Sequence, residues 1–251
     1  MIKGIDISTF QENVDYRKLK EEGIEFAIIR CGYGKDASQK DEMFETHYAG
    51  LKEAGIKVGC YHYSYCTSVE NAIKEAENCL SYIKGKEFDL PVFYDLEEAR
   101  TSELGIDQVT QIALIFCRRI RESGYEAGVY ANLNWFKNYI RPDALLLENF
   151  KIWLAQWNNE INANFPVDVW QFTNKLQVAG LSVDGDYLVN EDLINKNSVP
   201  TPELNIDLYQ SLAVDVIFGK FGNGDERKQA LGNYYDQVQN IVNEIYNIIN
   251  P

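Results

Sequence analysis

Three acidic residues follow closely on one apolar stretch of the chain. In LPVFYDLEEAR, residues 90–100, the apolar run ends at Tyr94, and Asp95, Glu97 and Glu98 come directly after it. Carboxylates at the end of a buried strand cost free energy unless a partner pairs with them. The stretch therefore fits a solvated strand end, a metal site or a catalytic pair of acids.

The spacing of Asp95 and Glu97 favours a catalytic pair. Residues two apart on a strand point to one face with Cβ atoms about 6–7 Å apart, whereas Glu98 points the other way. Two acids on one face raise the pKa of one of them, and a carboxylic acid that stays protonated can protonate a glycosidic oxygen. We assign the longer Glu97 as general acid and Asp95 as the group that orients the substrate. Because hard cations also bind clustered carboxylates, a Mg²⁺ or Mn²⁺ site stays open.

Strands that alternate with helices supply the frame for these acids. Three charged helical segments end in Gly shortly before an apolar strand, at Gly23, Gly55 and Gly124. Glycine suits the residue after a helix because positive φ costs it little. This alternation predicts βα units and a parallel sheet. The predicted strands are Ile2–Ser8, Phe26–Gly32, Val58–Tyr65, Pro91–Leu96, Ala127–Ala131, Ile152–Gln156, Val167–Phe172 and one near Asp186, with helices at Val14–Glu22, Met43–Ala54, Val69–Lys84 and Asp107–Ser123.

The sequence pattern of the later part of the chain differs from that of the first 140 residues. After about residue 140 the helical patterns thin out, and about eight strands suit barrel closure. We therefore predict an α/β fold, a TIM-like βα barrel over residues 1–195 whose last strands are joined by short loops. Residues 196–204 are polar and carry two prolines, which is typical of a linker. The helical pattern of residues 205–251 predicts a small all-α three-helix module.

Chemistry in a βα barrel gathers at the carboxyl-terminal ends of the strands. The residues expected there are carboxylates, aromatics and amides. Aromatic faces stack on sugar rings, while carboxylates and amides bind hydroxyl and acetamido groups. The rim therefore suits a carbohydrate. Its members are Asp6, Tyr61, His62, Tyr94, Asp95, Glu97, Tyr130, Trp157, Gln171, Asp184 and Asp186.

Bulk composition narrows the class of protein. Hydrophobic residues make up 45% of the chain, enough for a sizeable core, and the net charge of −14 makes a nucleic-acid surface improbable. Five cysteines in no CxxC spacing indicate reduced core thiols, and two histidines disfavour a His-rich zinc site.

The start of the sequence and its apolar runs predict where the protein is made. The chain opens MIKGIDIS, which predicts a strand and not a signal peptide, and no apolar run approaches the roughly 20 residues of a membrane span. We expect a product made in the cytoplasm without a signal peptide, not inserted in a membrane, that acts on its target after release.

The motifs GIDIST-Q, VGCYHY, VFYDLE, VY-N, WLAQW, VWQFT and VAGLSVDGD resemble, in order, those of glycoside hydrolase family 25, the Chalaropsis-type lysozymes, over residues 1–194. The resemblance implies cleavage of the β-1,4 bond between N-acetylmuramic acid and N-acetylglucosamine in peptidoglycan, without metal or cofactor. It implies catalytic roles for Asp6, Asp95 and Glu97. For the fourth acid, counting from Gly180 gives Asp186, while Asp184 stays open. The family usually has Tyr where Trp157 stands.

The tail also resembles a known family. GKFGNGDER followed by Y-x-x-V-Q-x-x-V-N is similar to a cell-wall-binding repeat of phage lysins, with Phe221 and Arg227 as candidate ligand contacts. The two resemblances together imply a phage endolysin. One small module binds a polymer weakly, so we expect homo-oligomerisation through the tail to supply further copies.

Two other functions remain as alternatives. One is a wall-binding lectin without catalysis, against which the intact Asp95 and Glu97 argue. The other is a metal-dependent polysaccharide deacetylase, against which the scarcity of histidine argues.

Overall fold

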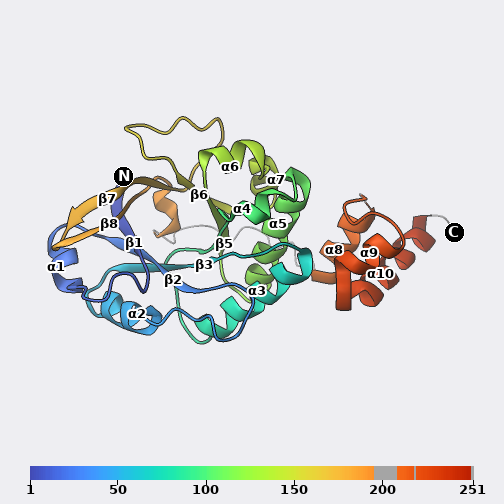
Figure 1. The fold of residues 1–251 in the computed structure, drawn as a ribbon, viewed down its shortest axis with the longest axis horizontal. Coiled ribbons are helices and arrows are strands. Elements are labelled where there is room, and N and C mark those ends of the chain that lie inside the picture. The colour runs from blue at the N-terminus through green and yellow to red at the C-terminus, as the bar shows by residue number, and fades with distance from the viewer. Residues whose placement is uncertain (195–207, 218, 250–251) are drawn as a thin grey trace.

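The computed structural model describes residues 1–194, 208–217 and 219–249 (Figure 1). The predicted linker, residues 196–204, lies outside the described residues.

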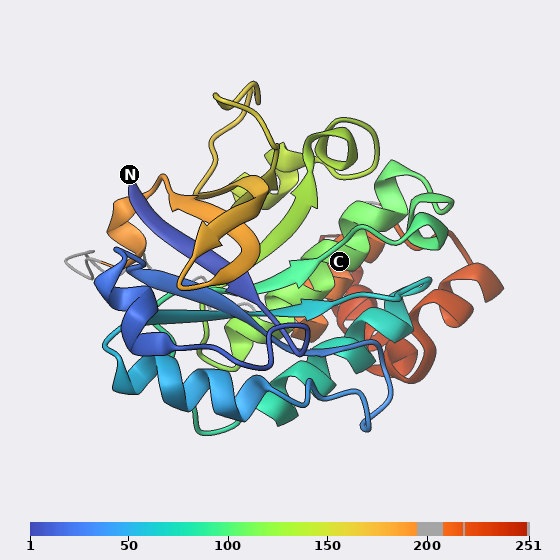
Figure 2. The same ribbon diagram turned by 60° about the vertical axis from the view of Figure 1, so that its left-hand side comes forward.

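Eight strands close into a barrel in chain order. Strands β1 to β7 run parallel to their neighbours, whereas β8 is antiparallel to both β7 and β1. The predicted α/β barrel is confirmed, and Figure 2 shows β8 closing it beside β1. The strands are β1 (Ile2–Ile7), β2 (Phe26–Tyr33), β3 (Lys57–Tyr63), β4 (Val92–Asp95), β5 (Ala127–Asn132), β6 (Lys151–Ala155), β7 (Val169–Val178) and β8 (Leu181–Leu188).

The four helices predicted between the first five strands are present at the expected places. They are α1 (Tyr16–Glu21), α2 (Phe44–Glu53), α3 (Val69–Ile83) and α5 (Ile106–Glu122). The three glycines predicted to follow helices have positive φ, at 87° for Gly23, 69° for Gly55 and 87° for Gly124.

The sequence analysis does not predict three short helices. They are α4 (Ala99–Ser102), α6 (Leu133–Asn138) and α7 (Pro142–Leu147). Each spans fewer than two turns, too short for a periodic pattern to stand out. Local signals start two of them: the Asn132 side chain accepts a hydrogen bond from the Trp135 N–H, and Pro142 opens α7.

The last strands are joined differently from what the sequence indicates. β6 and β7 are separated by the long loop 156–168, so the expectation of short loops throughout is wrong. Side-chain hydrogen bonds inside this loop, such as Gln156 to Asn162 at 3.0 Å, give the polar segment its own structure. β7 and β8 do form a tight hairpin around Ala179 and Gly180, whose φ values are 51° and 82°.

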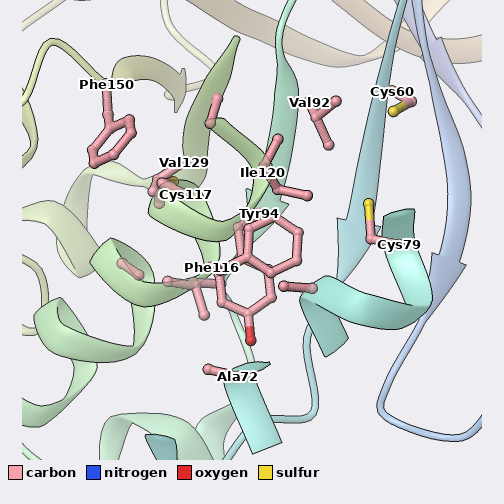
Figure 3. Close-up of a cluster of buried hydrophobic side chains, with 14 of the residues drawn as sticks. Cys60, Ala72, Cys79, Val92, Tyr94, Phe116, Cys117, Ile120, Val129 and Phe150 are labelled. Carbon is pink, nitrogen blue, oxygen red and sulfur yellow. The ribbon is translucent and has the colours of Figure 1, made fainter. Parts of the chain in front are cut away.

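Alternation along each strand divides the apolar side chains between two cores. Inside the barrel, Phe93, Tyr130 and Trp153 form an aromatic floor, with ring centroids 5.3 Å and 4.6 Å from Trp153. Outside it, Tyr94 of β4 stacks on Phe116 of α5 at 3.9 Å with an interplanar angle of 2° (Figure 3). The two cores fix which face of every strand looks into the barrel.

The chain beyond residue 207 is helical, as predicted. It contains α8 (Leu208–Ile217), α9 (Asp225–Leu231), a 3-10 turn (Gly232–Tyr234) and α10 (Tyr235–Ile249). These helices lie beyond α3 and α5 (Figure 1), and Tyr234 donates a hydrogen bond to Glu77 of α3 at 3.2 Å. Among the described residues no helix has the length and apolarity needed to cross a bilayer.

Candidate active site

A cavity of about 240 Å³ lies at the carboxyl-terminal ends of the parallel strands. Its walls combine acids, aromatic rings, amides and one guanidinium. The lining residues are Asp6, Ile7, Ser8, Phe10, Gln11, Arg30, Tyr61, Tyr63, Asp95, Glu97, Tyr130, Trp153, Gln171, Ser182, Val183 and Asp184.

Strand register brings the acids to this cavity. Asp95 ends β4 and lies opposite Tyr63 of β3 and Tyr130 of β5 in the parallel ladder. Asp6 of β1 lies opposite Asp184 of the antiparallel β8. Glu97 follows β4 directly and lines the same cavity as Asp95, which agrees with the prediction that these two acids share a face.

Burial favours the protonated forms of the predicted pair. Desolvation raises the pKa of Asp95 well above its usual range, and the nearby charges of Glu97 and Asp6 raise it further, while Arg30 opposes them. Desolvation also raises the pKa of Glu97, with added repulsion from Glu98 and Asp184. A protonated carboxyl at Glu97 is the form that can donate to a leaving oxygen.

The acids on the opposite wall differ in depth. Desolvation and the charge of Asp184 raise the pKa of Asp6 to about 7. Asp184 lines the cavity, whereas Asp186 is fully buried beneath it and accepts a hydrogen bond from the Trp153 indole at 2.8 Å. Desolvation, then the charge of Asp6, raises the pKa of Asp186 well above its usual range. Of the two late acids, Asp184 is therefore the one positioned to meet a ligand.

The Gln171 amide connects the two walls of the cavity. Its Nε2 donates to Asp6 Oδ2 at 2.8 Å and lies 3.4 Å from Asp184 Oδ2. Its Oε1 accepts from the Tyr130 hydroxyl at 3.2 Å and from the Trp157 indole at 3.0 Å. Since donors and acceptors on both sides fix one orientation of the amide, Gln171 holds the two acids in place. Trp157 itself stays 59% exposed at the rim, where its ring is available for stacking.

Two predicted substrate contacts are wrong. His62 and Tyr94 are fully buried on the outer face of the barrel. The Tyr94 hydroxyl donates to Glu75 of α3 at 2.7 Å, and His62 Nε2 bonds the Gly34 carbonyl at 2.9 Å. Side chains alternate along a strand, so the neighbours of inward-facing Tyr61, Phe93 and Asp95 point away from the cavity. The predicted Tyr61, Tyr130 and Gln171 do line it.

Glu98 and Phe221 also differ from expectation, whereas the predicted role of Arg227 as a ligand contact stays a prediction. Glu98 is tied to the cavity wall because its carboxylate accepts a hydrogen bond from the Tyr63 hydroxyl at 2.7 Å. Phe221 is buried among apolar side chains, so it is a core residue and not an exposed ligand contact. The Arg227 guanidinium donates to the Gly222 carbonyl at 3.1 Å and to the Gln239 amide at 2.9 Å.

The sequence analysis does not name Arg30, Tyr63, Trp153 and Phe10 as site residues, although all four line the cavity. Arg30 donates to Asp41 at 2.7 Å and places a cation beside Asp95. A charged residue inside the apolar run FAIIRCGY was a readable signal, because a buried charge requires a partner. Strict alternation along a strand puts Tyr63 on the same face as Tyr61, and Trp153 on the same face as Ala155, so both could have been predicted to point into the barrel. Phe10, exposed in a loop, gave no such signal.

Comparison with known proteins decides the family. The family model described as glycosyl hydrolases family 25 matches residues 5–181. The chain belongs to this family. The resemblance stated from the motifs is confirmed, and this family 25 enzyme is a glycoside hydrolase, a muramidase that acts on peptidoglycan. The CW_7 repeat model matches residues 210–246, so the enzyme carries a cell-wall-binding repeat after its barrel.

Individual relatives agree with the family assignment. The autolytic lysozyme of Clostridium acetobutylicum is 27% identical over 234 residues, covering 87% of this chain and 69% of that protein. Lysozyme M1 of Streptomyces globisporus is 25% identical over 197 residues, covering 74% and 66%.

Solved structures share the fold of the enzyme. The CTP1L endolysin matches 98% of this chain and 100% of its own, with a TM-score of 0.69 and 22% identity. The catalytic domain of endolysin ply40, from bacteriophage P40 of Listeria monocytogenes, matches 78% and 96%, with a TM-score of 0.63 and 28% identity.

Proposed function

We propose that this family 25 muramidase cleaves the β-1,4 bond between N-acetylmuramic acid and N-acetylglucosamine with Glu97 as proton donor. The observation that carries the proposal is the joint placement of Asp95 and Glu97 in one cavity, where burial raises both pKa values. Protonated Glu97 donates to the glycosidic oxygen as the bond breaks. A carboxylate that is ionised among the remaining acids of the cavity stabilises the positive charge that develops on the sugar.

The opposite wall supports substrate positioning. Asp6 and Asp184 face the pair across the cavity and are held by the Gln171 amide. Tyr61, Tyr63 and Tyr130 supply aromatic surface, and the exposed Trp157 offers a further stacking face near the rim.

The deciding experiment measures new reducing ends released from purified cell walls in the presence of EDTA. We expect activity to persist in EDTA, and Glu97→Gln to lower the rate at least ~100-fold, since a positioned general acid contributes that much. Glu103→Gln, an exposed acid nearby, is the matched control and should keep full activity. A Glu97→Gln rate within about tenfold of the parent would remove Glu97 from this role.

We also propose that the enzyme is a phage endolysin that its C-terminal helices target to the wall. Support comes from the CW_7 match and from the similarity to two endolysin structures. Deleting residues 208–251 should reduce lysis of whole cells far more than hydrolysis of soluble glycan fragments. Equal loss on both substrates would contradict targeting.

Homo-oligomerisation through the helices would supply the additional copies that a single weak module lacks. Sedimentation of the intact enzyme should then show a species larger than the monomer at working concentration. A strict monomer there would exclude this part of the proposal.

A further inference from the structure

Two cysteines and a histidine meet in the core between the sheet and α3, outside the catalytic cavity. Cys31 belongs to β2, His62 to β3 and Cys79 to α3. The potential ligand atoms of these three side chains all lie within 4.8 Å of one another, and all three side chains are fully buried. Figure 3 shows Cys79 on α3, with its sulfur directed toward the strands, and Cys60 on the sheet.

The distance between the sulfurs suits a shared metal ion. Cys31 Sγ and Cys79 Sγ are 3.6 Å apart. Two Zn–S bonds of about 2.3 Å at a tetrahedral angle place the sulfurs about 3.8 Å apart.

The imidazole of His62 is oriented as a metal ligand would be. Its Nε2 lies 2.9 Å from the Gly34 carbonyl, an acceptor, so Nε2 carries the proton. Nδ1 therefore keeps a free lone pair, and this buried atom has no hydrogen-bond partner among the described residues. Metal-binding histidines commonly donate their other N–H to a backbone carbonyl in this way.

A metal ion explains this arrangement more completely than either alternative. With ordinary core thiols, the donor available to the buried Nδ1 is the Cys31 S–H, and a thiol is a weak donor. A disulfide between Cys31 and Cys79 would leave the same atom unpaired. The rings of Tyr82 and Phe116, centred 6.3 Å and 6.0 Å from His62, give the group an apolar shell that keeps water out.

We propose that Cys31, His62 and Cys79 bind one zinc ion. Thiolates and imidazole are the ligands that zinc prefers in tetrahedral sites. Each coordinating thiol releases its proton to solvent as the ion binds. Since the ligands come from two strands and one helix, the ion clamps α3 onto the barrel wall behind the cavity.

Metal analysis of the intact enzyme tests the site directly. Protein produced in zinc-supplemented medium and purified without chelators should contain about one zinc per chain by mass spectrometry. Protein produced with cobalt should show thiolate-to-cobalt charge-transfer bands and the visible bands of a tetrahedral ion. An enzyme without bound zinc, and without the cobalt bands, would overturn the proposal whatever its variants do.

Matched cysteine variants locate the ion. Cys31→Ser should lose the zinc, whereas Cys66→Ser and Cys117→Ser, which change buried thiols elsewhere in the core, should retain it. If Cys31→Ser does not fold, His62→Gln provides a second test, because it removes one ligand and keeps all the thiols. Thiol titration of the unfolded enzyme should give all five cysteines; only three would indicate a disulfide and contradict the site.

Discussion

Arg118 of α5 donates a hydrogen bond to Asp215 of α8 at 2.6 Å, and both side chains are almost fully buried. The same guanidinium pairs with Glu148 at 2.6 Å, so one cation forms ion pairs with two acids. The barrel and the C-terminal helices are therefore held together by a buried charge and not only by apolar packing.

Removing that cation should weaken the whole structure. Arg118→Ala leaves Asp215 buried, with the half-exposed Lys220 as its remaining partner among the described residues, and breaking such a pair costs about 3 kcal/mol. Urea unfolding measures the loss. Arg121→Ala is the control, because Arg121 also pairs with Glu148 but is 44% exposed, and exposed pairs contribute at most about 1 kcal/mol. Equal losses in both variants would show that the junction does not depend on Arg118.

The pH dependence of activity should respond to Glu98. Desolvation, then the charges of Glu98 and Asp184, raises the pKa of Glu97. Glu98→Gln removes the first of those charges, so the pKa of Glu97 falls and its acid form is lost at a lower pH. The alkaline limb of the kcat profile should therefore move toward acidic pH. Glu103→Gln should leave that limb unchanged, and an unchanged limb in Glu98→Gln would mean that Glu97 is not the titrating acid.

The stability of the enzyme should depend on Asp6 in one pH window. The pKa of Asp6 is about 7 in the folded enzyme and about 3.9 in an unfolded chain, so the folded state holds the extra proton between these values. Stability contributed by this group therefore falls as pH rises through that window. Asp6→Asn should have a higher Tm than the parent at pH 7.5, and the difference should shrink toward pH 4.

A calorimetric series over these pH values checks the effect of Asp6. Asp36→Asn, at an exposed acid, is the control and should show no pH-dependent difference. A constant offset for Asp6→Asn across the series would mean that the residue does not carry the extra proton.

A substitution in the β7–β8 turn should stabilise the enzyme. Ala179 has a φ of 51°, a left-handed conformation that a residue with a Cβ adopts at a cost. Asn followed by Gly is the preferred pair for a two-residue hairpin turn, so Ala179→Asn should stabilise the enzyme by about 0.5–1 kcal/mol. Asn149 has a φ of 58° and serves as the reverse control. Asn149→Ala should destabilise the enzyme by a similar amount, because it places alanine in the same left-handed conformation. Denaturant titration that shows no gain for Ala179→Asn would refute the turn assignment.

Periodicity and glycine positions were enough to predict most of the barrel, because each strand and long helix carries its own apolar pattern. The site was harder. Choosing His62 in place of Tyr63 ignored the alternation that also separates Tyr94 from Asp95. Counting residues toward the late acid selected Asp186, yet β8 runs antiparallel, so the later residue lies deeper in the barrel and Asp184 lies nearer the rim.

Some relationships had no local signal at all. The Gln171 amide contacts side chains from four other segments of the chain, and Arg118 meets an acid 97 residues away. Such contacts depend on how complete elements are placed in space. No pattern within a single element encodes them.

The β7–β8 ribbon extends beyond the ladder that closes the barrel. Its pairing continues to Val178 and Leu181, whereas pairing with β6 stops at Gln171 and pairing with β1 stops at Asp184. Ser182 and Val183, in this free portion, line the cavity. Evolution or an engineer can therefore lengthen the ribbon at its tip and change how many sugars one wall touches, while every catalytic strand keeps its register.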